Sequence, residues 1–261
     1  MRIAVRARLL ALILIALTTF AGLASPAEAR RKGPGTVLIV THTTGFRHAS
    51  IEPAAAAIAA MAKEAGMLVE TTDAPERFDR PLDNVRVIAL VSTTTRRNQP
   101  ETEWLTGARR TAFQSFMRRG GGVLAIHGAA DSHYGWDWYG RMIGARFARH
   151  PKGTPTGTLR RSPTSHPAID GLPTEFTLTD EWYWLADVDP TLKPLLTLSP
   201  TSIGEPDTGL QPIAWAHAFE GGRVFYTALG HPPEAWQDPV VLNHVRGGLL
   251  WAAGIAGKGR R

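Results

Sequence analysis

Three histidines in this chain directly follow mainly apolar runs, a placement typical of a binding or catalytic site. They are His42 after residues 37–41, His127 after 123–126, and His231 after 223–229 and a glycine. The ordinary pKa of imidazole, about 6.5, lies close to neutral pH, so histidine can both accept and donate a proton there. Ligands of open α/β sheets bind outside the carboxyl ends of parallel strands. We therefore expect the three imidazoles to converge; for any one alone, a structural role in the core is the simpler interpretation.

His127 occupies the most distinctive of these positions. The segment GGGVLAIHGAA (120–130) predicts a buried strand that turns abruptly at small residues. Nucleophiles of α/β enzymes stand on such strand-to-helix turns, because the bend exposes the side chain and directs backbone N–H groups at the ligand. Imidazole is a poor group for acyl-enzyme chemistry but suits proton transfer. The motif argues against an amidotransferase or serine hydrolase and favours acid–base chemistry, metal ligation or binding.

Two carboxylates stand in an aromatic segment, DEWYW (180–184), after a predicted strand at 176–179. Adjacent side chains on extended backbone point to opposite faces, so only one of Asp180 and Glu181 can face a pocket. Aromatic rings beside a carboxylate are a common way to hold a sugar, and packing in the core is the alternative. The residues expected to contact a sugar here are the aromatic Trp138, Tyr139 and Trp182, together with Asp180.

The loop after the first predicted strand contributes Phe46, Arg47 and His48, which we expect at the mouth of the site. A surface role for Arg47 is equally compatible with the sequence. Among the candidate residues, histidine and glutamate are ligand types suited to zinc or another divalent ion. They are His42, His127, Glu181 and His231. No closely spaced histidine pair occurs among them, so the sequence assigns no metal ligand and leaves a divalent cofactor as an open alternative.

The first half of the chain must supply the parallel strands. An uninterrupted β-branched run predicts a strand buried on both faces at 36–41, and further strands are expected at 67–72, 85–92 and 123–126, the last of them also buried. Helices are expected from a cap at Ser50 to about Ala65, and over 101–119 before three glycines. This alternation indicates a doubly wound α/β sheet of the flavodoxin-like type.

The second half has a different pattern. Short runs separated by turn residues predict strands at 159–161, 176–179, 195–198, 213–218 and 223–228, and a closing helix is expected over 239–253. Helical patterns are otherwise missing there, so we expect additional antiparallel strands, with 213–218 pairing with 223–228 across a turn.

The N-terminus has the layout of a secretory signal peptide over residues 1–29. Three arginines precede an apolar run from Leu9 to about Leu23, and Ala27-Glu28-Ala29 forms a cleavage site. The run is shorter than the roughly 20 residues that span a bilayer, so we expect cleavage, a secreted or periplasmic protein and no stable membrane anchor. Residues 30–35 are expected to be a linker, 36–255 one α/β domain and 256–261 a basic tail.

Composition excludes several classes of protein. The 261 residues include no cysteine, which removes disulfides, zinc–cysteine sites and a thiol nucleophile. The formal net charge is +6, but the arginines are scattered and do not alternate with aromatic residues. We therefore expect no nucleic-acid partner.

Several motifs, in order, resemble the ThuA-like family, named for trehalose utilisation. They are THTTGFRH (41–48), GGGVLAIHGAAD (120–131), WDWYGRMIGARFARHP (136–151), SHPAIDGLP (165–173), DEWYW (180–184), PIAWAHAFEGGRVFYTALGHPPEAW (212–236) and GGLLWAAG (247–254). The resemblance implies a fold similar to class I glutamine amidotransferases without their cysteine nucleophile, in agreement with histidine at 127. It also implies a role in disaccharide catabolism, in which glucosides pass through 3-keto derivatives.

The resemblance and the site residues together favour an enzyme of the lyase or isomerase type that acts on a sugar. A carbonyl at C3 acidifies the C2 proton, which His127 or Glu181 would remove while His231 acts as the acid. The alternatives are a non-catalytic sugar-binding protein that partners a sugar dehydrogenase, and a metal-dependent hydrolase. Direct hydrolysis by two carboxylates needs the two groups about 5–9.5 Å apart. The obvious pair, Asp180 and Glu181, is consecutive in the chain, which disfavours this route.

Overall fold

The computed structural model describes residues 35–255, which form one α/β unit. The expected signal peptide, most of the expected linker and the basic tail lie outside the described residues. No helix between residues 35 and 255 combines the length and the apolar character that a bilayer span requires.

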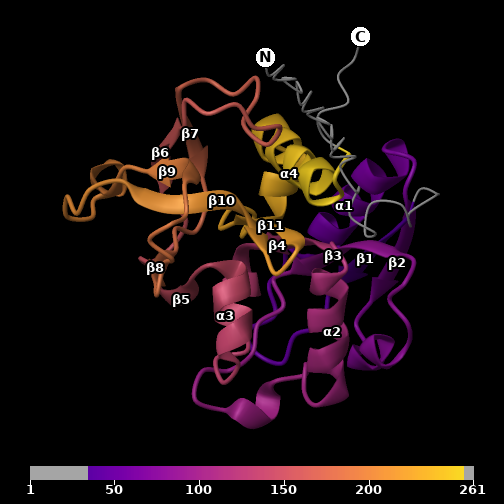
Figure 1. The fold of residues 1–261 in the computed structure, drawn as a ribbon. Coiled ribbons are helices and arrows are strands. Elements are labelled where there is room, and N and C mark those ends of the chain that lie inside the picture. Colours follow the sequence, from indigo (N-terminus) through magenta and orange to yellow (C-terminus); the bar gives the residue numbers. More distant parts are fainter. Residues whose placement is uncertain (1–34, 256–261) are drawn as a thin grey trace, which may run out of the picture. The chain divides into compact units, whose positions relative to one another are not determined.

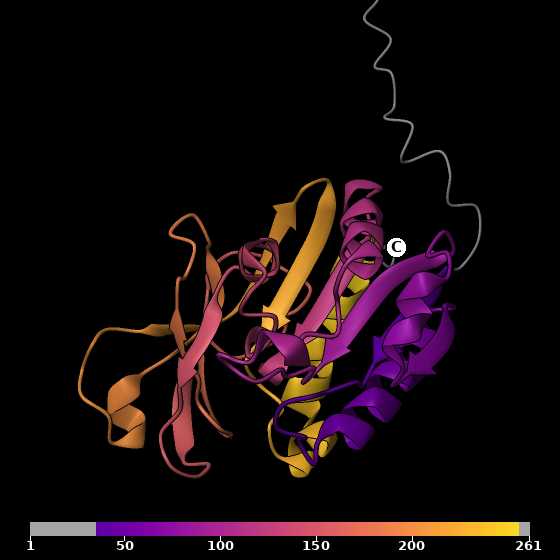
Figure 2. The ribbon, with the colours of Figure 1, turned by 90° about the horizontal axis from the view of Figure 1, so that it is seen from below.

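A nine-stranded sheet organises the fold in the order β2-β1-β3-β4-β11-β10-β9-β6-β7. The first five strands in this order are parallel, and the last four extend the sheet in antiparallel pairing (Figure 2). The parallel strands are β2 (Leu68–Thr72), β1 (Thr36–Val40), β3 (Val85–Val91), β4 (Gly122–Ile126) and β11 (Gly222–Thr227). The others are β10 (Gln211–Phe219), β9 (Pro194–Leu198), β6 (Thr156–Arg161) and β7 (Glu175–Thr179). This confirms the expected doubly wound sheet with additional antiparallel strands.

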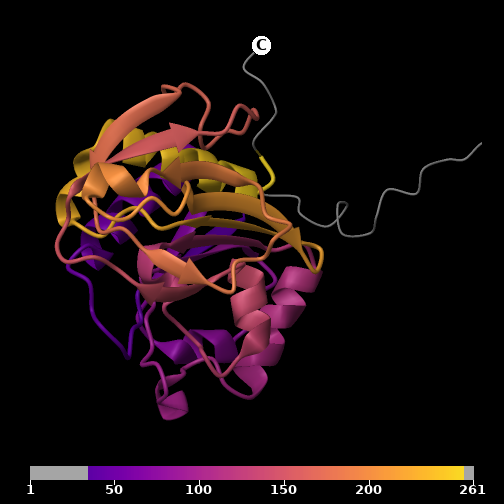
Figure 3. The same cartoon turned by 90° about the vertical axis from the view of Figure 1, so that its left-hand side faces the viewer.

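Helices cover both faces of the parallel strands. Helices α1 (Ile51–Glu64) and α4 (Pro239–Ala252) pack together on one face, and α2 (Ala108–Arg118) and α3 (Asp137–Ile143) lie on the other (Figure 1, Figure 3). Strands between two helical layers are buried on both faces, which is why β4 and, apart from Arg86, β3 are apolar instead of alternating.

The hairpin between β10 and β11 confirms the predicted antiparallel pair. Ala216 stands opposite Phe225, and the strands are joined by Glu220 and Gly221, which have φ angles of 43° and 90°. A two-residue turn with both φ angles positive matches the right-handed twist of the strands it connects. Because β11 also pairs in parallel with β4, this hairpin joins the two halves of the sheet.

The helix predicted over 101–119 begins later, at Ala108, because Gly107 before it has a non-helical φ of 51°. Before α2, a short 3-10 helix over Pro100–Thr102 is followed by buried loop residues 103–105, where the Glu103 carboxylate accepts a hydrogen bond from the Gly135 N–H at 2.5 Å and pairs with Arg110. Ser50 does stand at the N-terminus of α1, but its side chain makes no capping hydrogen bond.

Three elements lie outside the sequence-based expectations. They are α3 and the two-stranded sheet formed by β5 (Arg146–Arg149) and β8 (Trp184–Ala186). Their segments are short, with weak periodicity, so local pattern did not distinguish them from loops.

Candidate functional site

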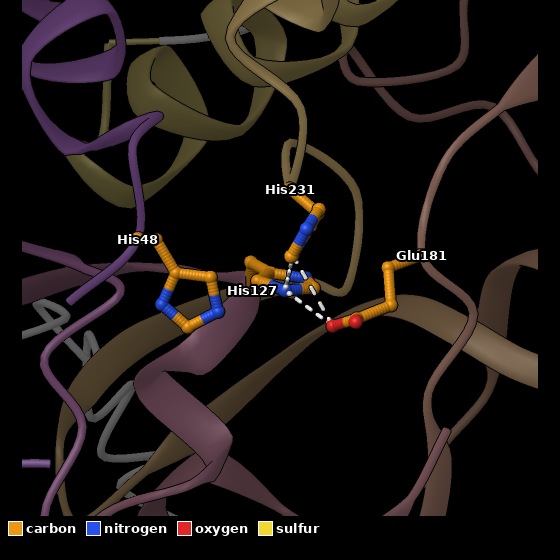
Figure 4. Close-up of side chains that lie close together, drawn as sticks. All are labelled: His48, His127, Glu181 and His231. Atoms are coloured by element: carbon orange, nitrogen blue, oxygen red, sulfur yellow. Dashed lines mark hydrogen bonds and ion pairs between the residues drawn. The ribbon is translucent and has the colours of Figure 1, made fainter. Parts of the chain in front are cut away.

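Four ionisable side chains converge where the parallel strands β4 and β11 end, and we call them the inner cluster (Figure 4). Its members are His48, His127, Glu181 and His231. They come from the β1–α1 loop, the first residue after β4, the β7–β8 loop and the segment after β11, respectively. One side-chain nitrogen or oxygen from each lies within 4.8 Å of the others.

Three members of the inner cluster are in direct polar contact. Glu181 Oε2 lies 3.2 Å from His231 Nδ1 and 3.4 Å from His127 Nε2. The two histidine nitrogens lie 3.2 Å apart. The fourth member, His48, packs edge-on against both imidazoles, with ring centroids 4.9 Å from His127 and 5.3 Å from His231.

His127 is held in one orientation at the turn after β4. Its φ angle is 46°, a left-handed value that histidine adopts more readily than most residues. Its Nδ1 lies 2.7 Å from the carbonyl oxygen of Ala228 and donates a proton to it, which leaves Nε2 as the nitrogen facing Glu181 and His231. The Tyr183 ring packs against the imidazole at 4.2 Å between centroids.

The two consecutive carboxylates point in different directions, as predicted from extended backbone. Asp180 is buried and accepts hydrogen bonds from the backbone N–H groups of Gly230 at 2.8 Å, His231 at 3.0 Å and Glu181 at 2.8 Å. Glu181 faces the inner cluster. Asp180 therefore positions the segment that carries His231, and the expectation that Asp180 contacts the substrate is not supported, because it does not line the pocket.

A pocket of about 220 Å³ opens above the inner cluster. Its lining residues are Phe46, His48, Asp131, Phe147, His150, Glu181, Tyr183 and His231. His150 Nδ1 lies 3.1 Å from Glu181 Oε1, and the Tyr134 hydroxyl donates to Asp131. Sequence reasoning did not single out Asp131 or His150, although each stands near the end of a motif that carries the family resemblance.

The electrostatics of the inner cluster follow from burial and mutual contact. Burial acts to raise the pKa of Glu181, but hydrogen bonds from His127 and His231 outweigh it and hold this pKa well below its usual range. The hydrogen bond with Glu181 raises the pKa of His231. Burial and the neighbouring histidines lower the pKa of His48 to about 3. Glu181 is thus ionised and His48 neutral near pH 7.

Asp131 lines the pocket, and its pKa is shifted in the opposite direction to that of Glu181. Burial raises the pKa of Asp131 and outweighs the hydrogen bond from Tyr134 and the nearby charge of Arg97. A carboxylate with a raised pKa is a stronger base than an ordinary one.

His42, which we expected in the site, lies outside it. Its Nδ1 is bonded to the carbonyl oxygen of Asp73 at 2.6 Å, and its ring packs edge-on against Trp104. Arg47, also expected at the mouth, pairs with Glu52 and donates to the Thr41 carbonyl, and it does not line the pocket.

The three aromatic residues expected to contact a sugar are buried in the core. The Trp138 Nε1 donates to Glu220 at 2.9 Å, the Tyr139 hydroxyl to the Ala129 carbonyl at 2.9 Å, and the Trp182 Nε1 to the Pro155 carbonyl at 2.8 Å. Their polar atoms are satisfied within the protein, so the expectation that they bind substrate is not supported. Phe46, Phe147 and Tyr183 supply the aromatic surface of the pocket instead.

The fold and the site together define an α/β protein with a glutamine amidotransferase-like sheet and a histidine at the turn after β4. A glutamine amidotransferase from Thermotoga maritima has this fold, with a TM-score of 0.52 at 12% identity over 85% of this chain and 99% of its own. The family described as ThuA, trehalose utilisation, matches residues 36–252, and the chain belongs to this family. It therefore has a role in trehalose or related carbohydrate utilisation.

Two solved structures described as ThuA-like share the fold more closely. One from Bacteroides uniformis has a TM-score of 0.67 at 22% identity, covering 88% of this chain and 95% of its own. One from Parabacteroides merdae has a TM-score of 0.66 at 16% identity, covering 87% and 93%. No curated protein matches the sequence.

Proposed function

We propose that this protein is an enzyme that removes the C2 proton of a 3-keto glycoside, leading to elimination or isomerisation. The observation that carries the proposal is the inner cluster, in which three imidazoles and a carboxylate meet beneath a small pocket. Membership of a trehalose-utilisation family makes a glucoside the substrate class of choice.

The reaction needs a base at carbon and a positive or hydrogen-bonding group at oxygen. A carbonyl at C3 acidifies the C2–H bond, and the electrons of that bond pass into an enolate. In elimination, they then form a C1=C2 double bond as the C1–O bond breaks, and the leaving oxygen takes up a proton. Reprotonation of the enolate at C2 gives isomerisation instead. Neither route passes through an oxocarbenium ion.

Asp131 is the group best suited to accept the C2 proton. It lines the pocket and its pKa is raised by burial, two properties of an effective general base. His127 is fully buried beneath the pocket, and Glu181 is engaged by three imidazoles, which makes both weaker candidates for proton removal than the sequence suggested. The inner cluster would instead stabilise the negative charge on the carbonyl oxygen, with His231 as the acid.

The test compares 3-keto-trehalose with unoxidised trehalose as substrates for the purified protein. We expect release of glucose from the keto sugar alone, or exchange of its C2 proton in deuterated water. Asp131→Asn is expected to lower this rate about 10²–10⁴-fold, the usual contribution of a general base. His42→Ala, which alters a histidine outside the pocket, is the matched control.

Each result has a definite meaning. Cleavage of plain trehalose would overturn the elimination mechanism, and full activity of Asp131→Asn would overturn the assignment of the base. Binding of the keto sugar without turnover would favour a non-catalytic accessory protein. A 3-keto glycoside arises by oxidation of a secondary alcohol, so a sugar dehydrogenase is the expected partner in either case.

We also propose that the protein is exported, on the basis of the apolar run and cleavage site within residues 1–29. The mass of the protein recovered from periplasmic or culture fractions tests this. A mature chain that begins near residue 30 is expected, and an intact N-terminus retained in the cytoplasm would contradict the proposal.

A further inference from the structure

We infer that the inner cluster binds one divalent transition-metal ion, with His48, His127, Glu181 and His231 as its ligands. Imidazole nitrogen and carboxylate oxygen are the ligand types of zinc and of similar ions, and three protein histidines with one carboxylate make a complete ligand set. The inference rests on the four side chains alone; only the purpose of the ion depends on the proposed function.

The separations of three of the ligand atoms match a metal site. In a tetrahedral zinc site with bonds of about 2.0–2.1 Å, neighbouring ligand atoms lie about 3.3 Å apart. The observed separations among His127 Nε2, Glu181 Oε2 and His231 Nδ1 are 3.2, 3.2 and 3.4 Å. One ion can therefore contact all three atoms with little movement.

His48 completes the set from the opposite side. Figure 4 shows its ring directed toward the other three residues, and its donor atom lies within the 4.8 Å that spans the cluster. The ring is buried, yet Nδ1 has no hydrogen-bond partner among residues 35–255. Nε2 is the ring nitrogen of His48 nearer to the other three residues in Figure 4, so an ion in the cluster would bind at Nε2.

The surroundings have the features of a metal site. The Nδ1–H of His127 donates to the Ala228 carbonyl, and such outer contacts fix the tautomer of metal-binding histidines. Asp180 fixes the backbone of His231 and Glu181 in the same way. His127 is fully buried, so a substrate cannot reach its Nε2 directly, whereas a single ion among the four ligands can.

The ligand set also indicates which class of ion the cluster would bind. Calcium and magnesium prefer oxygen ligands, whereas three nitrogens and one oxygen suit zinc, cobalt, nickel or iron. The pocket of about 220 Å³ lies above the cluster, so a molecule in the pocket is placed to supply a fifth ligand to an ion held by the four side chains. In the proposed reaction, an ion there would hold the C3 carbonyl oxygen while Asp131 removes the proton.

The experiment measures metal binding in the absence of sugar. Purified protein is stripped with chelator and titrated with Zn²⁺ by calorimetry and with Co²⁺ by visible absorbance, and the thermal midpoint is recorded with and without the ion. We expect one ion per chain, an increased midpoint and cobalt absorption bands of low coordination number. Glu181→Gln and His48→Ala are expected to weaken binding at least 10-fold.

His42→Ala is the matched control and is expected to bind the ion as tightly as the unaltered protein, because His42 is bonded to the Asp73 carbonyl outside the cluster. Far-ultraviolet circular dichroism shows whether each variant is folded. A stoichiometry of zero, or equal affinity in Glu181→Gln, His48→Ala and the unaltered protein, would overturn the site. Tight binding of one ion with no action on 3-keto-trehalose would support the site and count against the proposed function alone.

Discussion

Asp180 accepts a hydrogen bond from the backbone N–H of His231 at 3.0 Å, so the residue next to Glu181 also holds the segment that carries His231. Its other oxygen accepts from the Gly230 N–H at 2.8 Å. Two members of the inner cluster that lie 50 residues apart in the chain are thereby held in register by one buried carboxylate.

Asp180→Asn is expected to disturb this arrangement, because the amide presents N–H groups where the carboxylate oxygens accept. We expect the free energy of unfolding to fall by about 1–3 kcal/mol, the cost of an unsatisfied buried polar group. We also expect kcat on 3-keto-trehalose to fall at least 10-fold with little change in KM, since Asp180 positions the site without lining the pocket. Urea unfolding and steady-state kinetics measure the two effects.

Asp207→Asn is the control for this variant. Asp207 also accepts a backbone hydrogen bond, from the Gly209 N–H at 3.1 Å, but it is exposed and far from the pocket in sequence. Its substitution should change stability by less than about 0.5 kcal/mol. Equal effects of the two substitutions would contradict the positioning role of Asp180.

Phe46→Ala is expected to weaken substrate binding. Phe46 lines the pocket and is 66% exposed, with its ring edge-on to His48 at 4.8 Å between centroids. Loss of an aromatic contact worth about 0.5–1.5 kcal/mol raises KM up to about 10-fold, with kcat nearly unchanged. Leu210→Ala, at another exposed apolar residue outside the pocket, should leave both constants unchanged. An unaltered KM in Phe46→Ala would show that this ring does not contact the substrate.

Gly247→Ala is expected to destabilise the protein, although alanine normally favours a helix over glycine by about 1 kcal/mol. A Cβ at this position in α4 would lie 2.1 Å from the carbonyl oxygen of Pro167, which is backbone and cannot move easily. We expect a loss of about 1–3 kcal/mol in thermal or urea unfolding. Asn243→Ala, exposed on the same helix, should be neutral or slightly stabilising. A stabilised Gly247→Ala would mean that the β6–β7 loop, which contains Pro167, can move away from α4.

Stability is expected to fall as the pH is lowered below about 6.5. Burial lowers the pKa of His244 to about 4 and that of His133 to about 3. Between these values and 6.5, the unfolded chain binds protons that the folded protein does not, so each residue removes up to about 1.4 kcal/mol of stability per pH unit. Well above pH 6.5, both histidines are neutral in the folded and the unfolded protein, so this loss of stability is absent.

His244→Asn tests this origin of the pH dependence. The amide can replace the hydrogen bond from His244 Nδ1 to the Ala168 carbonyl, but it does not titrate. Urea unfolding at pH 7.5, 5.5 and 4.5 should show a shallower decline for the variant than for the unaltered protein. Parallel declines would assign the effect to other groups.

Local sequence was sufficient to predict the elements whose residue pattern directly reflects their burial or their turn. The runs that became β1, β3 and β4 are largely apolar because helices cover both faces of the sheet, and this burial is visible in composition alone. The β10–β11 hairpin was predictable because Gly221 and Gly222 mark a short turn between two strand-like runs. The turn at His127 was equally evident, since small residues follow a buried strand directly.

Tertiary structure alone decided which histidine joins His127 and His231. His42 follows β1 closely, yet it turns to the Asp73 carbonyl, whereas His48 returns to the cluster from farther along the same loop. The path of a loop depends on the surfaces against which it packs, and these come from distant parts of the chain. For the same reason, the sequence identified an aromatic, acidic and histidine-rich composition for the site, and only the packed fold separated the residues that face the pocket from those that support it.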